Sequence, residues 1–509
     1  MTSLLKNKIF IYIIPFLIGL ISSYSLPPYS FFFINFFTFP TFLFLLILNY
    51  SKGKKVLFAI GWMFGFGYFI SNLYWITNSL TFEDIFKPLI PLALTLIPLF
   101  LGLFYGLAAL IFSLFNIKKN FTSIIIFSFS LSLIEYIRSF IFGGFPWNLV
   151  AYSFAEYLNL IQILSIIGTY SLNLLSITIF LLPTIFLFEY KKKTKFISLL
   201  LVLSILIVNF IFGELTIKKF EKTKKNNLDF TIKIVSPQID INRFFQNENP
   251  EKIISDLIKI AKPDTSKETI FIFPEGIISS IYLQDLKKYS SEFSNNFSDK
   301  HKIILGINSY EDSKVYNSLV VIDKDVNILS KYYKNKLVPF GEFLPYEKFF
   351  NKLGFKKITQ GYQSFSSHNR RDTINLNNFK FIPLICYEII YSGKINKYND
   401  DYDFILNISE DGWFGNSIGP YQHFSHSIFR SIEEGKYVIR STNNGISAFI
   451  NSKGQIIDKV LTTKKGFIEL KSFKDAKKTI FSSYGNKIFF YFLAFYISLI
   501  FFLKKKENK

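Results

Sequence analysis

Three apolar segments of this sequence each end at residues that can take part in covalent or acid–base chemistry. Segments 271–274, 381–385 and 404–408 run into Glu275, Cys386 and the triplet Ser409-Glu410-Asp411, respectively. Apolar strands that end in reactive side chains are typical of the edge of an α/β sheet, where the sheet fixes those side chains in one place. The three segments therefore predict one active site rather than three unrelated strand ends.

Cys386 is the only cysteine of the chain, so it cannot form an intrachain disulfide. A thiol that attacks a carbonyl needs a base or a lowered pKa, and a carboxylate together with a cation can supply these. None of the four histidines has a comparably anchored position, so a Cys–His pair is not predicted. His423 and His426, three residues apart on a predicted helix, lack a nearby third ligand. We therefore expect neither a metal site nor a cofactor.

Longer runs around these residues resemble a known enzyme superfamily. Glu275 in FPEG, Lys334 in KYYKNKLVPFGEFLP and Cys386 in ICYE are similar to the Glu-Lys-Cys triad of the nitrilase, or carbon–nitrogen hydrolase, superfamily. The runs LVPFGEFLP and GWFGNSIGPYQHF are long and specific, and they narrow the resemblance to the apolipoprotein N-acyltransferases. The resemblance covers essentially the whole chain, from GFPW in the apolar half to RSTNNGISA at residues 440–448.

This resemblance implies an αββα sandwich and an acyltransferase. The reaction would move a fatty acyl chain from a membrane phospholipid, through a Cys386 thioester, to the α-amino group of the N-terminal diacylglyceryl-cysteine of an apolipoprotein. By position, Cys386 is the nucleophile and Glu275 the general base. Lys334 would stabilise the thiolate and the oxyanion, together with a backbone N–H that follows the nucleophile. Lys331 and Lys336 lie close by, and only the register of the motif selects Lys334.

Further residues match or depart from the family pattern. Glu342 resembles the family's auxiliary carboxylate, and Tyr387 and Glu388 match the residues that flank its nucleophile. Phe244 and Phe245 stand in the region after the first strand where the family usually has a Trp, and Glu410 stands where it commonly has Asn. These departures leave the triad intact and bear on acyl-chain preference rather than on reaction class.

Residues 218–486 predict one domain that positions these side chains. β-Branched runs predict strands at 230–235, 270–273, 303–307, 317–322, 380–385, 404–408 and 446–450. Helical periodicity predicts helices at 250–262 and 421–435. Strands mixed with helices over this length indicate an α/β domain, which a charged linker at 218–225 joins to the preceding part of the chain.

The rest of the chain, 1–217 and 487–509, is dominated by long apolar runs. We predict membrane spans near 9–25, 30–49, 56–77, 88–115, 121–141, 158–188, 196–213 and 487–503. Each has roughly the 20 residues that a helix needs to cross a bilayer. Only 19% of all residues are charged, against about 25% in a typical soluble domain. A membrane domain of about seven helices, 1–217, thus precedes the α/β domain, and a last helix with a basic tail, 487–509, follows it.

Lysines mark every second loop between these spans. They stand before the first run, after the second, fourth and sixth runs, and after the eighth. Basic loops stay cytoplasmic, so we predict that both termini are cytoplasmic and that 218–486 faces the other side. No small-x-small cleavage site follows the first run, which we interpret as an uncleaved span. Together with the resemblance, this predicts a bacterial inner-membrane protein whose catalytic domain lies in the periplasm.

Charge and the remaining polar residues limit the other hypotheses. The net charge of +21 is spread over both parts of the chain without a basic stripe interleaved with aromatic residues, so we expect no nucleic-acid partner. Glu135 and Arg138 share a helix face within a span, and we interpret them as a structural ion pair. We expect a monomer. Two alternatives stay open: a membrane-tethered amidase of the nitrilase type that uses water as acceptor, and a non-enzymatic membrane scaffold or transporter.

Overall fold

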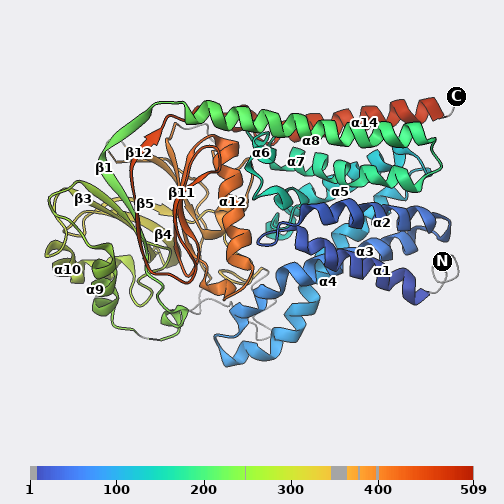
Figure 1. The fold of residues 1–509 in the computed structure, drawn as a ribbon. Coiled ribbons are helices and arrows are strands. Elements are labelled where there is room, and N and C mark those ends of the chain that lie inside the picture. The colour runs from blue at the N-terminus through green and yellow to red at the C-terminus, as the bar shows by residue number, and fades with distance from the viewer. Residues whose placement is uncertain (1–7, 247, 346–363, 377–378, 397–400, 508–509) are drawn as a thin grey trace. The chain divides into compact units, whose positions relative to one another are not determined.

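Two compact units make up the protein in the computed structural model, which describes residues 8–246, 248–345, 364–376, 379–396 and 401–507 (Figure 1). The helical unit comprises Met1–Thr77, Asp84–Lys218 and Thr479–Lys509. The sandwich unit comprises Asn78–Glu83 and Lys219–Lys478. The short segment Asn78–Glu83 thus belongs to the sandwich unit, although the sequence on both sides of it belongs to the helical unit.

Apolar helices form the helical unit. Their bounds are α1 (Lys8–Ser22), α2 (Asn35–Leu48), α3 (Lys54–Leu73), α4 (Ile90–Phe112), α5 (Phe121–Arg138), α6 (Leu158–Ile161), α7 (Leu164–Leu181), α8 (Lys192–Glu221), α13 (Ile480–Tyr484) and α14 (Lys487–Glu507). Among the described residues, six helical segments are long and apolar enough to cross a membrane, and Tyr12–Ser25 and Phe32–Leu48 are shorter apolar helices. The chain is therefore a multi-pass membrane protein.

Two helices differ from the predicted spans. The run 158–188 is not one helix but α6, α7 and the 3-10 segment η9 (Leu182–Leu187). Gly168, inside α7, has φ +72°, which lies outside the helical region and interrupts the regular helix. Helix α8 continues to Glu221 and β1 begins at Lys225, so most of the predicted charged linker is helix and strand.

In the part of the sandwich unit that the structure describes, there are two six-stranded sheets, with the orders β12-β1-β2-β3-β4-β5 and β11-β10-β9-β8-β7-β6. The strands are β1 (Lys225–Ser236), β2 (Thr269–Ile272), β3 (His301–Glu311), β4 (Lys314–Ile322), β5 (Ile328–Tyr333), β6 (Ile374–Leu376), β7 (Phe379–Ile385), β8 (Phe404–Glu410), β9 (Tyr437–Asn443), β10 (Ser447–Ile450), β11 (Ile456–Val460) and β12 (Gly466–Lys474). Strands β1–β3 run parallel, as do β7–β9, and the other neighbours are antiparallel. The predicted α/β sandwich is confirmed.

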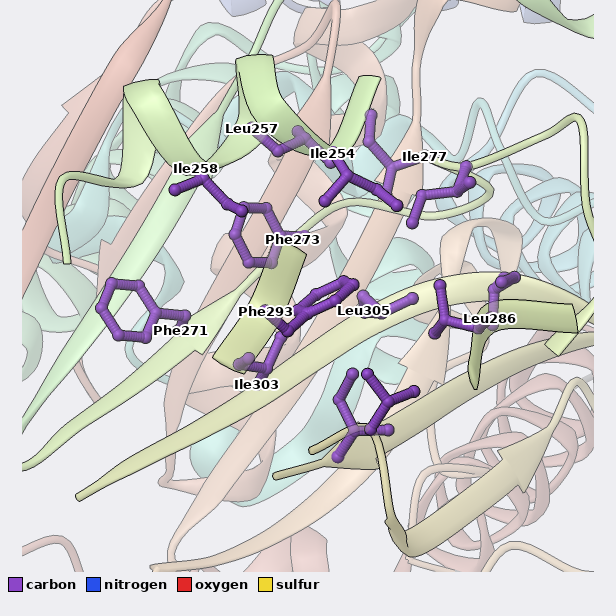
Figure 2. Close-up of a cluster of buried hydrophobic side chains, with 14 of the residues drawn as sticks. Ile254, Leu257, Ile258, Phe271, Phe273, Ile277, Leu286, Phe293, Ile303 and Leu305 are labelled. Atoms are coloured by element: carbon purple, nitrogen blue, oxygen red, sulfur yellow. The ribbon is translucent and has the colours of Figure 1, made fainter. Parts of the chain in front are cut away.

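A hydrophobic core lies between the first sheet and helices α9 (Pro250–Ala261) and α10 (Ser290–Ser294) (Figure 2). Its large members include Ile254, Leu257, Ile258, Phe271, Phe273, Phe293, Ile303 and Leu305. Asn249 caps α9, since its side chain accepts a hydrogen bond from the Glu251 N–H at 2.9 Å. Burial of each such side chain stabilises the fold by about 1.5–3 kcal/mol. This core fixes β2, the strand that leads to Glu275.

Small polar side chains join the two sheets. The Ser441 hydroxyl, on β9, donates to the carbonyl oxygens of Val235 and Ile272, both at 3.2 Å. The Ser236 hydroxyl, on β1, donates to the carbonyl oxygen of Thr442 at 3.1 Å. Because serine is short, the backbones of β1 and β2 lie close to β9. The carboxyl ends of parallel strands from both sheets therefore meet in one place.

Candidate active site

Glu275 lies just beyond the end of β2. The N–H of Phe273 donates to the carbonyl oxygen of Ile304 at 2.8 Å, and the N–H of Gly306 donates to that of Pro274 at 3.1 Å. Gly306 is required here, because a Cβ at this position would lie 2.4 Å from the Cα of Glu275. The glycine allows the Glu275 backbone to lie directly against β3. Glu275 itself is only 7% exposed.

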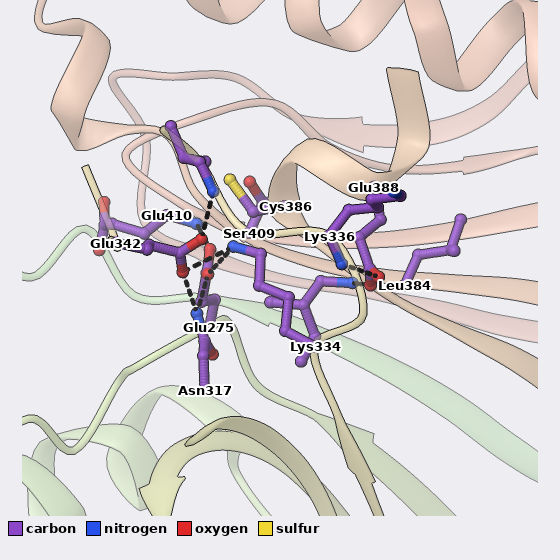
Figure 3. A network of polar contacts seen from close by, with 12 residues as sticks. Glu275, Asn317, Lys334, Lys336, Glu342, Leu384, Cys386, Glu388, Ser409 and Glu410 are labelled. Carbon is purple, nitrogen blue, oxygen red and sulfur yellow. Dashed lines mark hydrogen bonds and ion pairs between the residues drawn. The ribbon is translucent and has the colours of Figure 1, made fainter. Parts of the chain in front are cut away.

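Lys334 follows β5 and brings its ammonium group to the Glu275 carboxylate (Figure 3). Its backbone N–H donates to the carbonyl oxygen of Asn317 in β4 at 2.9 Å, which fixes the residue beside the antiparallel strand pair. Its Nζ donates to Glu275 Oε1 at 3.1 Å and to Glu342 Oε1 at 2.9 Å. The lysine therefore joins the two carboxylates.

Asn317 bridges the same two carboxylates. Its Nδ2 donates to Glu275 Oε1 at 2.7 Å and to Glu342 Oε1 at 2.8 Å. Glu342 is also held by its own loop, since its N–H donates to the carbonyl oxygen of Val338 and its Oε2 accepts from the Val338 N–H, both at 2.9 Å. One carboxylate oxygen of each glutamate thus points at the same ammonium and amide groups.

Burial separates Lys334 from the neighbouring lysines. The Lys334 side chain is 1% exposed, whereas that of Lys331 is 41% exposed and pairs with Glu311. Lys336 is exposed, and its backbone N–H, rather than its ammonium group, donates to Glu388 at 3.1 Å. The lysine that the motif register selects is therefore the buried one.

Cys386 is the first residue after β7 and has a left-handed backbone, with φ +50°. Such a conformation costs a non-glycine residue about 1–3 kcal/mol, and it persists only where the surrounding structure imposes it. Here β7 ends directly before Cys386 and the 3-10 turn η12 (Cys386–Ile390) begins with it. The residue is 8% exposed, and Ser409 is a polar neighbour of its thiol. A sharp turn after a strand is a common way to present a nucleophile at the end of a sheet.

Burial and nearby charges decide the protonation of the lysine and the thiol. Burial alone would lower the pKa of Lys334, but Glu275 and Glu342 raise it well above its usual range. Burial raises the pKa of the Cys386 thiol well above its usual range, Glu275 raises it further, and Lys334 opposes both. The resting site thus holds a charged lysine and a protonated thiol. The thiol needs a base before it can attack, and the Glu275 carboxylate is close enough to influence it.

Glu388 ties the loop that carries Lys334 to the turn that carries Cys386. Its carboxylate accepts hydrogen bonds from the Tyr332 hydroxyl (2.7 Å), the N–H groups of Ile385 (2.8 Å), Asn335 (2.9 Å) and Lys336 (3.1 Å), and the Arg371 guanidinium (2.7 Å). Its neighbour Tyr387 is buried, with its ring 5.4 Å from that of Tyr391. Glu388 therefore fixes the spacing of the lysine and the cysteine.

Asp411 belongs to a second buried network beside the thiol. Its Oδ1 accepts from the Ser409 hydroxyl at 2.7 Å and lies 2.9 Å from His423 Nδ1, and its Oδ2 accepts from Arg440 Nη2 at 2.8 Å. Burial alone would raise the pKa of Asp411, but Arg440 and His423 lower it to about 2. Because Ser409 donates to Asp411 and is a polar neighbour of Cys386, this network lies beside the nucleophile. His423 is a hydrogen-bonding partner of Asp411 in this network.

The departures from the family pattern also lie at this site. Glu410 is buried, and its N–H donates to Glu275 Oε2 at 2.9 Å. Its carboxylate forms an ion pair with the buried Arg243. Arg243 belongs to the 3-10 turn η10 (Ile241–Phe244), so this ion pair connects the Phe244 turn to the strand end that holds the Glu275 carboxylate.

Among the residues of this site that sequence reasoning missed are Arg243, Gly306, Asn317 and Arg371. Gly306 left a signal, because a glycine inside the apolar run IILGI is typical of a place where another backbone comes close. The other three left none. Their partners lie far away in the chain, as with Arg243 and Glu410, and only the pairing of strands brings them together.

Comparison with known proteins identifies the family of this chain. A family model described as apolipoprotein N-acyltransferase N-terminal domain matches residues 18–182, and one described as carbon–nitrogen hydrolase matches residues 254–469. The apolipoprotein N-acyltransferase of Brucella melitensis biotype 1 is 30% identical over 473 residues, which are 89% of this chain and 88% of that protein. The chain belongs to the apolipoprotein N-acyltransferase family. The predicted family and the predicted enzyme class, an acyltransferase, are confirmed.

A second relative is similar over nearly the whole chain. The apolipoprotein N-acyltransferase of Rickettsia prowazekii (strain Madrid E) is 32% identical over 510 residues, 96% of this chain and 99% of that protein. Among solved structures, a CN-hydrolase superfamily protein from Xanthomonas campestris matches 48% of this chain and 91% of its own chain, at 14% identity and a TM-score of 0.35.

Proposed function

We propose that this protein transfers a fatty acyl chain from a membrane phospholipid, through a thioester at Cys386, to the α-amino group of the N-terminal diacylglyceryl-cysteine of an apolipoprotein. The observation that carries the proposal is the buried group of Glu275, Lys334 and Cys386 in a chain with membrane-spanning helices. Family membership supports a lipid and a lipoprotein as the two substrates. The proposed reaction needs no cofactor, and the protein acts as a monomer.

In the first step Glu275 takes the proton of the Cys386 thiol, and the thiolate attacks an ester carbonyl of the phospholipid. The resulting oxyanion is stabilised by the Lys334 ammonium and the backbone N–H of Tyr387. The carbon–oxygen ester bond breaks, and Glu275 returns the proton to the leaving alkoxide of the lysophospholipid. The products are an acyl-thioester and a lysophospholipid.

In the second step the α-amino group of the lipoprotein attacks the thioester carbonyl. Glu275 takes a proton from the amine, the carbon–sulfur bond breaks to release the Cys386 thiolate, and Glu275 gives that proton to the thiolate. An amide forms and the free thiol is restored. Burial opposes the charge of Lys334, but Glu275 and Glu342 raise its pKa well above the usual range, and the Cys386 thiolate, which also raises it, takes over when Glu275 is protonated.

Residues 218–486 carry this chemistry, and residues 1–217 and 487–509 anchor it in the membrane. The lysine-rich loops support cytoplasmic termini and a periplasmic catalytic domain in the bacterial inner membrane. To test this in a Cys386→Ala background, single cysteines are introduced at Ser51 and Ser291 and treated with a membrane-impermeant thiol reagent in intact cells. We expect labelling at position 291 and protection at position 51. The opposite pattern contradicts the proposed orientation.

The reaction itself is tested with phospholipid that is labelled in its acyl chain. The protein should acquire a label that neutral hydroxylamine removes, and a diacylated lipoprotein peptide should then take up that acyl chain as an amide, as measured by mass spectrometry. Cys386→Ala should show neither. Release of free fatty acid without acylated peptide would identify a membrane-tethered amidase that uses water. Full transfer by Cys386→Ala would contradict the thioester.

A further inference from the structure

The ion pair between Arg243 and Glu410 is buried completely, which requires an explanation. The two side chains are 0% and 1% exposed. Removing two charges from water costs several kcal/mol for each ion, and mutual attraction only partly offsets this cost. Burial of such a pair therefore does not by itself mean that the pair stabilises the fold. Its position, between the general base and a group of aromatic rings, indicates what it does.

Glu410 connects three segments of the site. Its backbone N–H donates to Glu275 Oε2 at 2.9 Å, which ties it to the proposed base. One carboxylate oxygen, Oε2, accepts from Arg243, and the other, Oε1, accepts from the N–H of Gly412 at 2.8 Å. Gly412 begins the 3-10 turn η13 (Gly412–Phe414), which carries Trp413. The single side chain of Glu410 thus holds both the Arg243 turn and the Trp413 turn.

Arg243 in turn places the ring of Phe244. The guanidinium carbon lies 4.4 Å from the centre of that ring, and Nη2 also donates to the carbonyl oxygen of Gly276 at 3.3 Å. A Cβ at Gly276 would lie 3.1 Å from Phe244 Cζ, so the tip of the ring rests on the residue that directly follows Glu275. The Phe244 ring also stacks on Trp413, with the ring centres 5.4 Å apart.

Two more rings extend this stack into an aromatic cluster, defined here as Phe82, Phe244, Phe245 and Trp413. Phe245 lies 6.2 Å from Trp413, and Phe82 lies 5.8 Å from Trp413 and 6.0 Å from Phe245. Phe82 belongs to the segment Asn78–Glu83, and Asn78 Nδ2 donates to the carbonyl oxygen of Phe414 at 2.6 Å. The four rings are all partly exposed. Apolar surface of this kind beside a catalytic carboxylate suits a fatty acyl chain rather than a polar substrate.

We propose that Arg243 and Glu410 are positioning residues for the acyl donor: their buried ion pair fixes the Phe244 ring against Gly276, so that the aromatic cluster forms the wall that receives the fatty acyl chain. The inference rests on the proposed function and adds a determinant of chain-length preference to it. Neither residue reacts with the substrate. Without the pair, the Phe244 and Trp413 turns lose their common anchor while the triad keeps its own contacts.

The test compares two phospholipids that share a headgroup and carry either hexadecanoyl or hexanoyl chains. The rate of lysophospholipid release is measured in detergent micelles with the full-length protein. This readout follows the donor half-reaction whether the acceptor is an amine or water, whereas acylation of the lipoprotein peptide, measured in parallel, reports on the proposed function separately.

Arg243→Met should raise KM for the hexadecanoyl donor about tenfold, the size of effect that one lost apolar fit produces, and change KM for the hexanoyl donor by less than about twofold. Arg243→Lys should restore part of the loss. The double variant Arg243→Met/Glu410→Gln leaves no unpaired buried charge, so it should fold as the wild type does and still show the long-chain defect. The inference would be overturned if KM for Arg243→Met rose equally with both donors or with neither. It would also be overturned if the double variant had the wild-type KM for the hexadecanoyl donor.

Discussion

The helical unit and the sandwich unit each bury an ionic cluster, and the two clusters are built in different ways. Glu135 and Arg138 stand three residues apart on α5, each with a side chain that is 1% exposed, and their charged groups are 3.9 Å apart. Glu275 and Lys334 follow different strands of the first sheet, and Cys386 follows a strand of the second. One cluster is local in the sequence, and the other exists only through the fold.

The contacts of the two clusters indicate different roles. Glu135 accepts hydrogen bonds from Tyr105 on α4 and Asn173 on α7, and Arg138 donates to the carbonyl oxygen of Phe145. This cluster joins three helices and a loop, which is a structural role. In the sandwich unit two carboxylates share one ammonium group beside a thiol whose backbone is strained. Keeping the like charges of Glu275 and Glu342 together lowers the stability of the fold, which is typical of a reactive site.

The largest effect is expected at Glu275 and Lys334 of the sandwich cluster, where substitutions should lower activity and leave the protein folded. Glu275→Gln keeps the shape of the side chain but removes the base, and Lys334→Met removes the cation. A general base contributes about 10²–10⁴-fold and an oxyanion donor about 10²–10³-fold. We expect each variant to lose at least about 10²-fold in acyl transfer by those same contributions, while it keeps its secondary structure in circular dichroism.

The matched control for Lys334→Met is Lys336→Met, which removes an exposed lysine from the same loop. It should lose far less activity than Lys334→Met. If the two variants were equally inactive, the assignment of the cation within this group of lysines would be wrong.

The helical cluster should respond in the opposite way. Glu135→Leu leaves Arg138 buried without its carboxylate, and breaking a buried pair in this way costs about 3–5 kcal/mol. We expect a lower free energy of unfolding in detergent and unchanged activity per folded molecule. The double variant Glu135→Leu/Arg138→Met should recover most of the stability. A stable Glu135→Leu protein that is inactive would give this cluster a functional role instead.

The same contrast explains what could be predicted from the sequence. A spacing of three residues on an apolar helix was enough to pair Glu135 with Arg138. At the sandwich cluster, apolar strand ends identified Glu275 and Cys386 as candidates, but only the motif register selected Lys334. Asn317 was predicted merely as part of a strand, because the strand pairing that turns its amide toward the two carboxylates has no local signal. Strands β5, β6, β9, β11 and β12 were missed.

A smaller effect is expected at Glu388, which links the loop of Lys334 to the turn of Cys386. Arg371→Met removes the cation that pairs with the buried Glu388 at 2.7 Å, while the neutral donors to that carboxylate remain. A hydrogen bond to a charged group contributes about 1.5–3 kcal/mol, so the free energy of unfolding should fall by about that amount. Because Glu388 fixes the spacing of Lys334 and Cys386, kcat should fall while KM for the phospholipid changes little.

Arg370→Met is the control for Arg371→Met, since the adjacent Arg370 side chain is 64% exposed and pairs with Asp372 at the surface. It should leave both the stability and kcat close to those of the wild type. A rise in KM together with the fall in kcat for Arg371→Met would indicate that the residue contacts the substrate rather than the framework.

The smallest effect concerns the network beside the thiol and appears only at acidic pH. Burial would raise the pKa of Asp411, but Arg440 and His423 lower it to about 2 in the folded protein, below the value of about 3.9 for an unfolded chain. The ionised carboxylate therefore contributes stability that is fully present above the unfolded pKa and is lost as the pH falls through about 2. Between pH 5 and pH 2 the free energy of unfolding of the wild type should fall by at most about 2 kcal/mol more than that of Asp411→Asn, as measured by denaturant titration at each pH.

The control is Asp299→Asn, at a position whose side chain is 89% exposed, and it should keep the pH dependence of the wild type. Parallel pH curves for the wild type and Asp411→Asn would show that the network is held together by shape and not by the charge of Asp411.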